Sequence, residues 1–179
     1  MKLKSTIIPI VAAIAMTTVD ARANMLFDLY AGAFVSAGAA THFIDGNADT
    51  YAAQSFGAVF GLDIPVFRIE LEYDYLNAEH SRMNAGMVNG YFKMPSTLVH
   101  PYLGVGMGAT FAGRAPGDAQ TKDSVAYQGM LGLTFDVPVL PLKVDGEVRA
   151  LYAPGAYVVN DDNAHILHYD ARLKLRYIF

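Results

Sequence analysis

The sequence contains no cysteine and no tryptophan, and it holds no long apolar run after residue 23. Without cysteine there is no disulfide, no thiol chemistry and no lipid-modified N-terminal cysteine. A helical membrane span needs about 20 consecutive apolar residues, and residues 24–179 contain no such stretch. Any membrane crossing by this chain therefore has to use a closed β-barrel.

The first 23 residues have the order of a secretory signal peptide. Lysines at positions 2 and 4 precede an apolar run over residues 7–16, and residues 21–23 form a cleavage site of the small-x-small type. The apolar run has about half the length of a membrane span. We therefore expect residues 1–23 to be removed and residues 24–179 to form one domain.

Positive charge is scarce as well. Removing Lys2, Lys4, Arg22 and Asp20 with the signal peptide leaves 10 basic and 16 acidic residues, a formal charge of −6. A chain with this balance lacks the basic surface that binds phosphate backbones. Nucleic acid is therefore excluded as an expected partner.

The most informative pattern is strict alternation over residues 67–75. Five apolar residues alternate with four charged ones, namely Phe67, Ile69, Leu71, Tyr73 and Tyr75 with Arg68, Glu70, Glu72 and Asp74. Successive side chains of a β-strand point to opposite faces, so one face is bulky and apolar and the other is ionised. Such a strand suits a wall with lipid outside and a polar, charge-paired interior.

About eight strand-like runs follow one another, near residues 26–37, 51–63, 66–76, 85–94, 99–111, 124–137, 142–152 and 166–179. The last of them repeats the alternation and ends on Phe179. Short connections alternate with longer ones at residues 38–50, 77–84, 112–123 and 153–165, and Pro65, Pro95, Pro138 and Pro141 lie at predicted strand ends. Short periplasmic turns alternating with longer extracellular loops are typical of outer-membrane barrels.

The charged faces of these strands define a predicted interior set of nearly balanced sign. Its anions are Asp28, Glu70, Glu72, Asp74, Asp136, Asp145, Glu147 and Asp170, and its cations are Arg68, Lys93, Lys143, Arg149, Arg172, Lys174 and Arg176. An eight-stranded barrel has room for side chains and little else, and unpaired buried charges are costly. We expect a salt-bridge ladder in which Arg172, Lys174 and Arg176 meet Asp28, Asp145 and Glu147. Its structural interpretation is a packed plug; its functional interpretation is an ion path or gate.

Glycine recurs at every second position within residues 101–108, inside a strand pattern. A phosphate-binding glycine loop would need a helix N-terminus to follow it. These glycines are instead predicted to make space on the inner face, where arginine or tyrosine side chains from neighbouring strands can cross the backbone.

In the order and spacing of these pieces, the chain resembles the small outer-membrane β-barrel family that includes the OmpA transmembrane domain, OmpX and the Opa-type surface antigens. The resemblance spans the whole chain: the signal peptide, residues 67–75, 101–108 and 128–133, and the final residues 176–179. It implies that Tyr177 and Phe179 form the signal read by the barrel-assembly machinery. It also implies that the loops carry adhesion or other surface interactions.

Catalytic residues are not expected. His165 and His168 are three residues apart in or near a strand, which places them on opposite faces and spoils a shared metal site. Neither histidine begins a His-x-Ser motif like that of the lipid A deacylase, because Ile166-Leu167 follow His165 and Tyr169-Asp170 follow His168. An Asp-Ser pair like that of the lipid A palmitoyltransferase is found only at Asp123-Ser124, which would need His42 or His80 as its base. We expect no catalytic residue, no metal and no cofactor.

The sequence thus predicts an all-β, eight-stranded antiparallel up-and-down transmembrane β-barrel over residues 24–179, in the outer membrane of a Gram-negative bacterium. The expected role is non-enzymatic, structural or surface-interacting, of the adhesin or surface-antigen class, through loops 38–50, 112–123 and 153–165. Expected partners are outer-membrane lipid and lipopolysaccharide, the barrel-assembly machinery, and an extracellular or host ligand. The alternatives are a narrow porin-like channel, a lipid A-modifying enzyme, and a soluble lipocalin-like barrel with an apolar lining.

Overall fold

A computed structural model describes residues 27–44, 47–78, 81–96, 98–114, 120–121, 123–159 and 162–179. The predicted signal peptide lies outside these residues. The strands are β1 (Asp28–Ile44), β2 (Asn47–Asp63), β3 (Phe67–Ala78), β4 (Ser81–Lys93), β5 (Val99–Arg114), β6 (Gln120–Thr121), β7 (Ser124–Asp136), β8 (Leu142–Val159) and β9 (Asp162–Ile178). No helix in the described part of the chain is long and apolar enough to cross a membrane.

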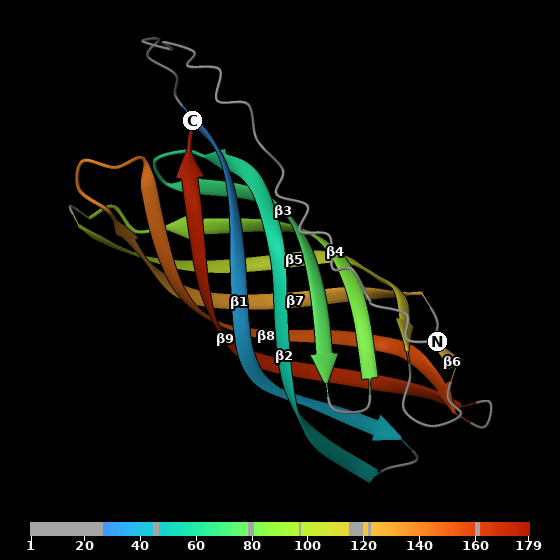
Figure 1. The fold of residues 1–179 in the computed structure, drawn as a ribbon. Helices are drawn as coiled ribbons and strands as arrows, with labels where there is room; N and C mark the ends of the chain where they lie inside the picture. The colour runs from blue at the N-terminus through green and yellow to red at the C-terminus, as the bar shows by residue number, and fades with distance from the viewer. Residues whose placement is uncertain are drawn as a thin grey trace, which may run out of the picture.

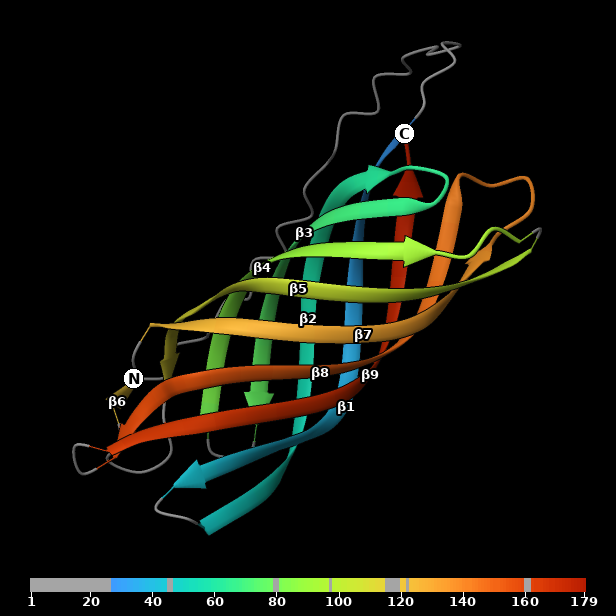
Figure 2. The same ribbon diagram turned by 180° about the vertical axis from the view of Figure 1, so that it is seen from behind.

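Eight long strands form one closed antiparallel barrel. Each pairs with its neighbours along the chain, and β9 pairs with both β8 and β1 to close the sheet. The two-residue β6 lies beside the far end of β8, opposite Tyr157 and Val158. Figures 1 and 2 show the same wall from front and back, with the strands tilted across the barrel. The predicted up-and-down topology is confirmed.

The predicted facing of the charged strand is also confirmed. In β3 the side chains of Phe67 and Leu71 are each 55% exposed, whereas Arg68 and Glu70 are fully buried inside the barrel. The same alternation continues in β4 and β7. Because the pleat has a period of two, one register places the apolar residues of Phe67–Tyr75 outside and the four charges between them inside.

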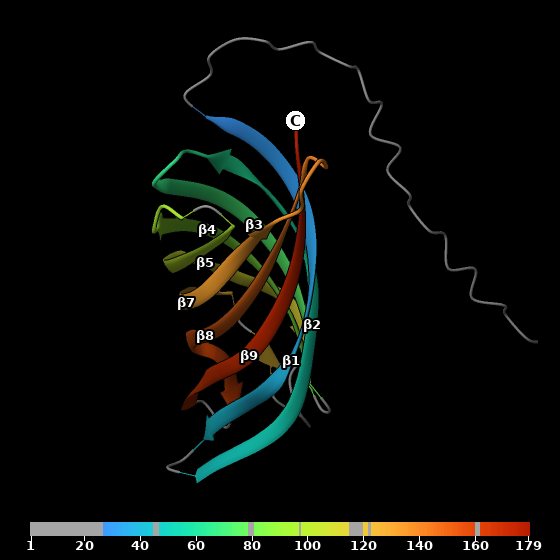
Figure 3. The same cartoon turned by 90° about the vertical axis from the view of Figure 1, so that its left-hand side faces the viewer.

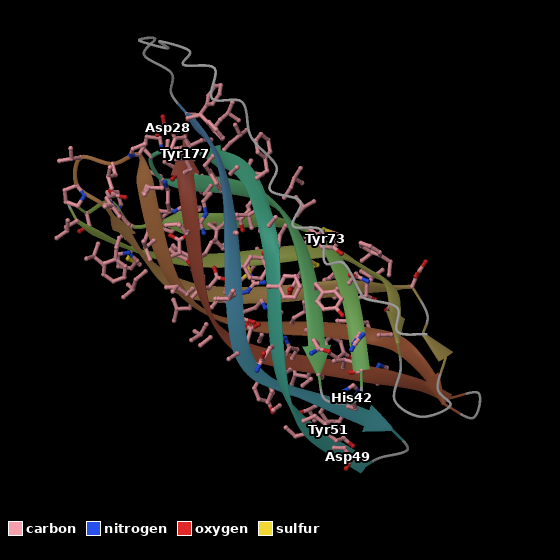
Figure 4. All side chains as sticks on the ribbon, viewed as in Figure 1. Asp28, His42, Asp49, Tyr51, Tyr73 and Tyr177 are labelled. Atoms are coloured by element: carbon pink, nitrogen blue, oxygen red, sulfur yellow. The ribbon has the colours of Figure 1, made fainter. Side chains whose placement is uncertain are left out.

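The two ends of the barrel differ. The end that holds Asp28 and Tyr177, here the terminal end, carries short turns, and Figure 4 shows His42, Asp49 and Tyr51 at the opposite, loop end. The terminal-end turns contain all four predicted strand-end prolines. In the turn between β7 and β8, Val139 has φ of 72° and its side chain is fully exposed. A β-branched residue in this left-handed region is strained.

The predicted long loops are largely wrong. Residues 38–50 are mostly strand, because β1 and β2 stay paired up to Ile44 and Asn47. β3 continues to Ala78, and β8 continues to Val159. These segments are rich in small and polar residues, which have low intrinsic strand propensity, but pairing with the neighbouring strand overrides that propensity. The loop end therefore carries extended hairpins of β1 with β2 and of β8 with β9, and Figure 3 shows the paired ends of β1 and β2 at the bottom of the view.

Candidate functional site

The interior of the barrel holds layered ion pairs, and the layer nearest the terminal end is built on Asp63. Its carboxylate accepts hydrogen bonds from Lys93, from Lys143 Nζ at 3.2 Å and from Arg176 Nη1 at 3.2 Å. A pocket of about 450 Å³ opens above this layer, and His100 and Asp136 pair at 3.0 Å on its wall. The Lys143 side chain is 22% exposed at this mouth, whereas the Arg176–Asp145 pair deeper in the barrel is completely buried.

The next layer is centred on Asp145. Arg176 forms a two-point pair with it, Nε to Oδ2 at 2.7 Å and Nη2 to Oδ1 at 2.9 Å, and Arg68 Nη1 adds a third contact at 3.2 Å. The Arg68 guanidinium lies over the rings of Tyr91 and Tyr102, with its central carbon 3.9 and 4.7 Å from the ring centroids. Ring faces supply favourable electrostatics to a cation that has few other partners.

Glu70 forms the next layer toward the loop end. It accepts hydrogen bonds from Lys174 Nζ at 2.7 Å, from the Tyr30 hydroxyl at 2.7 Å and from the Tyr91 hydroxyl at 2.8 Å. The two phenols come from strands on opposite sides of β3 and fill the space around a single carboxylate. A buried carboxylate needs this number of donors to offset the hydration it loses.

The next layer toward the loop end joins β3 to β8 and β9. Arg172 bonds Glu72 at 2.7 and 3.1 Å, Asp74 at 3.3 Å and Glu147 at 3.3 Å, and it lies 3.9 Å over the ring of Phe34. Every one of these charged side chains is within 1% of complete burial. The layer is therefore a desolvated cluster whose charges are stabilised by one another.

Arg149 completes the cluster toward the loop end. Its Nη1 bonds Asp74 at 2.6 Å, and its Nη2 and Nε bond the two carboxylate oxygens of Asp170 at 2.6 and 3.1 Å. Ser36 donates a further hydrogen bond to Asp170 at 2.7 Å.

The predicted network set is brought together with one exception. Asp28 is exposed at the rim, where water solvates its carboxylate, and it does not lie inside the barrel as expected. Asp63, its register partner on β2, is the carboxylate that meets Arg176. The remaining predicted residues all take part in ion pairs: Arg68, Glu70, Glu72, Asp74, Lys93, Asp136, Lys143, Asp145, Glu147, Arg149, Asp170, Arg172, Lys174 and Arg176.

Asp63 was missed although the sequence held a signal for it. It follows the outward Leu62 by one position, so strand alternation places it inside. The alternation of the strands predicts that Tyr30, Asn89, Tyr91 and Gln128 face inward, and they do, but without a charge they were not assigned to the network. Tyr102 was missed.

The inner-face glycines make space for these side chains, as predicted. A Cβ on Gly104 would meet the ring of Tyr91, and a Cβ on Gly132 would meet the ring of Tyr102. On the outer wall, a Cβ on Gly129 would meet nothing within 4 Å. The inward glycines thus let two aromatic rings lie flat against the wall, where they support Arg68.

The loop-end part of the interior is apolar. A buried cluster of alanines with Leu76, Met83, Met87, Leu151 and Ile166 fills it. This cluster was not predicted from the sequence, because its inward alanines and methionines lie in strands whose alternation is weak. Charged layers and this cluster together fill the described interior with side chains.

At the loop end, the hairpin of β1 and β2 carries an exposed carboxylate, Asp49, in register with buried His42. The His42 ring meets the Tyr51 ring edge-on, with centroids 5.7 Å apart (Figure 4). Burial lowers the pKa of His42 below its ordinary value, and the Asp49 carboxylate partly opposes that shift.

Among the described residues, the Asp123-Ser124 pair that was considered for catalysis is not hydrogen-bonded to a histidine. The Ser124 hydroxyl donates to the backbone carbonyl of Pro154, and His165 accepts the Gly155 N–H at 3.3 Å. His42 lies on a different hairpin, and His80 lies outside the described residues. Within the described ranges, no group of three or more histidine, aspartate or glutamate side chains is placed to hold a metal ion.

Comparison with known proteins places the fold. No family model and no curated protein sequence matches the chain. Neisserial surface protein A matches with a TM-score of 0.60 at 14% identity, over 84% of this chain and 97% of that one. From Pseudomonas aeruginosa, the N-terminal β-barrel domain of OprF gives 0.56 at 13% identity (83% and 97% covered), and OprG gives 0.52 at 11% (86% and 95%). This chain has the fold of the small outer-membrane β-barrels.

Proposed function

We propose that this chain is a non-enzymatic bacterial outer-membrane protein of the surface-interaction class, of adhesin or surface-antigen type. Its terminal end would face the periplasm, and its loop-end hairpins would face the exterior. The observation that supports the proposal is the distribution of polar groups. The outer wall is apolar and the interior is packed with side chains, so the loop-end hairpins are the part of the barrel that offers accessible polar groups to a partner.

The outer wall supports a membrane location. Leu103, Val105 and Met107 on β5 are 60–68% exposed, and Leu131 and Leu173 on other strands are nearly as exposed. A soluble protein rarely leaves so continuous an apolar surface in water. In a bilayer the same surface is solvated by acyl chains, and barrel closure leaves no strand edge in the lipid.

The filled interior argues against a channel or an interior active site. The ion pairs cross the barrel, and the apolar cluster lies between them and the loop end. An open pore would need these layers to separate. Neisserial surface protein A, one of the structural matches, is named as a surface protein, and that name fits a role carried by the hairpins.

Surface exposure is tested with epitope tags in intact cells of a Gram-negative host. A tag inserted at residues 45–46 should bind antibody without permeabilisation. A matched tag at residues 95–96, in a terminal-end turn, should bind only after the outer membrane is opened. The reverse pattern would refute the orientation, and loss of both signals from the outer-membrane fraction would refute the location.

The proposed assembly partner reads the end of β9. Phe179 donates its N–H to the Leu29 carbonyl at 2.9 Å, and its ring lies 5.3 Å from that of Tyr177. We further propose that the barrel-assembly machinery recognises these two aromatics before the barrel closes, and that lipopolysaccharide surrounds the loop end of the folded wall. The signal peptide, residues 1–23, is part of the same proposal, and N-terminal sequencing of the exported protein should begin at Asn24.

A further inference from the structure

We propose that the terminal-end turns of the barrel insert into the phospholipid headgroup region, so that this end of the molecule is itself a membrane-surface contact. The turns are residues 64–66, residues 94–96 with Leu98, and residues 137–141. The inference concerns the end opposite the hairpins to which the surface interaction is assigned, and it does not depend on that function.

The turns expose large apolar side chains. Val139 is fully exposed, Leu140 is 55% exposed, and Met94 and Leu98 are 58% and 57% exposed. Leu131, in the middle of the outer wall, is 58% exposed, so the turns present apolar side chains to the same extent as the lipid-facing wall. Apolar surface of this kind is unfavourable in water. The lipid contact of the wall therefore continues onto the turns.

The residues of these turns differ from those of turns in water. Pro138 and Val139 occupy the two central positions of a turn that the Leu140 N–H closes onto the Val137 carbonyl at 3.3 Å. A positive φ at the second central position, as at Val139, belongs to a type II turn, in which glycine or asparagine is the usual residue. Residues 64–66, 94–96 and 137–141 contain no glycine, no asparagine and no charged residue. The turns thus lack most of the polar residues that favour contact with water.

The backbone of the turn between β7 and β8 suits a low-dielectric environment. Pro138 and Pro141 have no N–H. The Val137 N–H donates to the Leu142 carbonyl at 3.0 Å, and the Leu140 N–H is used to close the turn. Unpaired backbone groups are what normally keeps turns out of lipid. Because four of the five residues offer no free N–H, the turn loses little hydration when it enters the headgroup region.

The height of the wall places this turn at the edge of the hydrocarbon. Tyr127 of β7 and Tyr152 of β8 are exposed register partners near the loop end. From Tyr127, β7 runs nine more residues to Asp136, which is about 30 Å along the strand at about 3.3 Å per residue. At a strand tilt of about 40° this gives about 23 Å of height, close to the apolar band of about 25 Å in outer-membrane barrels. Residues 137–141 begin where that band ends, at the level of the headgroups.

A lipid surface fits these turns better than a protein partner does. The exposed apolar side chains belong to separate turns of the same end, and Phe179 at the end of β9 adds to them (Figure 2). A protein interface usually has a polar rim with fixed hydrogen bonds. Among the described turn residues only Ser96 is polar, and it lines the mouth pocket. A headgroup layer needs no fixed polar contacts and can cover apolar side chains of several turns at once.

Single tryptophans test the contact, because the chain has none of its own. The folded barrel is placed in phosphatidylcholine nanodiscs, where water reaches both faces and no other membrane protein is present. Leu140→Trp and Leu98→Trp report the turns, Leu131→Trp reports the wall, and Asp123→Trp reports an exposed loop-end position. Lipid brominated near the headgroup should quench both turn variants, and aqueous iodide should quench them less than Asp123→Trp. Iodide quenching of Leu140→Trp equal to that of Asp123→Trp, with no quenching by bromolipid, would overturn the insertion.

Cysteine alkylation gives a second readout that is free of the preference of tryptophan for membrane interfaces. In the same nanodiscs, Leu98→Cys should react with a charged maleimide about tenfold more slowly than Ser96→Cys, because a lipid environment disfavours the reacting thiolate. Ser96→Cys is the matched control, since it lies in the same turn and lines the mouth pocket. Equal rates would place Leu98 in water and overturn the proposal. Each variant is first checked for the mobility shift of a folded barrel. Neither measurement depends on which end faces the exterior, so its failure would leave the surface-interaction proposal standing.

Discussion

The charge cluster around Arg172 gives the sharpest test of the interior. The perturbation is a double-mutant cycle of Arg172→Met and Glu72→Gln. Methionine keeps an unbranched side chain against the Phe34 ring but removes the guanidinium, and glutamine keeps the shape of Glu72 but removes its charge. Each single variant therefore breaks the pair with little loss of packing.

The magnitude follows from the contacts. Arg172→Met removes a two-point pair with Glu72, at 2.7 and 3.1 Å, and each charge-assisted bond contributes about 1.5–3 kcal/mol. Glu72 retains Asn89 at 2.8 Å and Arg149 at 3.4 Å. We therefore expect a loss of about 3 kcal/mol, near the lower limit for breaking a buried pair. Glu72→Gln should lose about 2 kcal/mol, because Arg172 keeps Asp74 and Glu147.

The double variant removes both charges and leaves neither partner unpaired. Its loss should be smaller than the sum of the single losses by about 2 kcal/mol. The assay is urea unfolding in lipid vesicles, followed by circular dichroism and by gel mobility of the unheated protein, since the chain has no tryptophan to report by fluorescence. Single effects that add to within about 0.5 kcal/mol would refute the reasoning.

Four further predictions use the same unfolding assay or a simple readout. Gly104→Val should lose about 1–3 kcal/mol because its side chain meets the inward Tyr91 ring, whereas Gly129→Val, on the outer wall, should lose less than about 1 kcal/mol; equal losses would contradict the space-making role. Val139→Gly should stabilise the barrel by about 1 kcal/mol by relieving the left-handed conformation, and a loss would show that the turn depends on that side chain. Deletion of Phe179 should lower the amount of folded barrel in the outer membrane while refolding in detergent persists, and equal loss in both would point to stability alone. Because the pKa of His42 is lowered, the unfolded chain binds more protons, so stability should fall as pH drops below about 6.5; His42→Gln should weaken this dependence, and an unchanged pH profile would exclude His42 as its source.

An electrical measurement addresses the channel alternative. Planar bilayers containing the refolded barrel should show no steady conductance, because paired charges and the apolar cluster fill its interior. A stable conductance that changes in Arg172→Ala would favour the ion-path interpretation of the network.

The alternating strands could be predicted from the sequence because a single physical rule governs them. Phe67–Tyr75 and the end of β9 alternate bulky apolar and charged residues, so each had one register that buried its charges. Glycines 104, 106 and 108 were informative for the same reason, since their spacing matched the pleat.

The loop end was harder, because its residues carry little pattern of their own. In residues 38–53, alanine, glycine and threonine give no alternation strong enough to separate strand from loop. Their strand structure comes from the partner across the hairpin, which is a tertiary effect. Asp28 was misplaced for a related reason. Alternation predicts which face of the sheet a residue lies on, but the position along the strand decides whether that residue lies inside the barrel or at its exposed rim.

The interior pairs are also far apart along the chain. Arg172 lies 100 residues from Glu72, Lys174 lies 104 residues from Glu70, and Arg176 lies 113 residues from Asp63. The anions belong to strands made early and the cations to the strand made last. Until β9 docks, β3 has three carboxylates without these partners, so a partly inserted sheet would carry them unneutralised into a low-dielectric environment. Barrel closure and charge neutralisation are thus one event, and this coupling makes insertion cooperative. A chain that lacks β9 should therefore not be stable in the membrane.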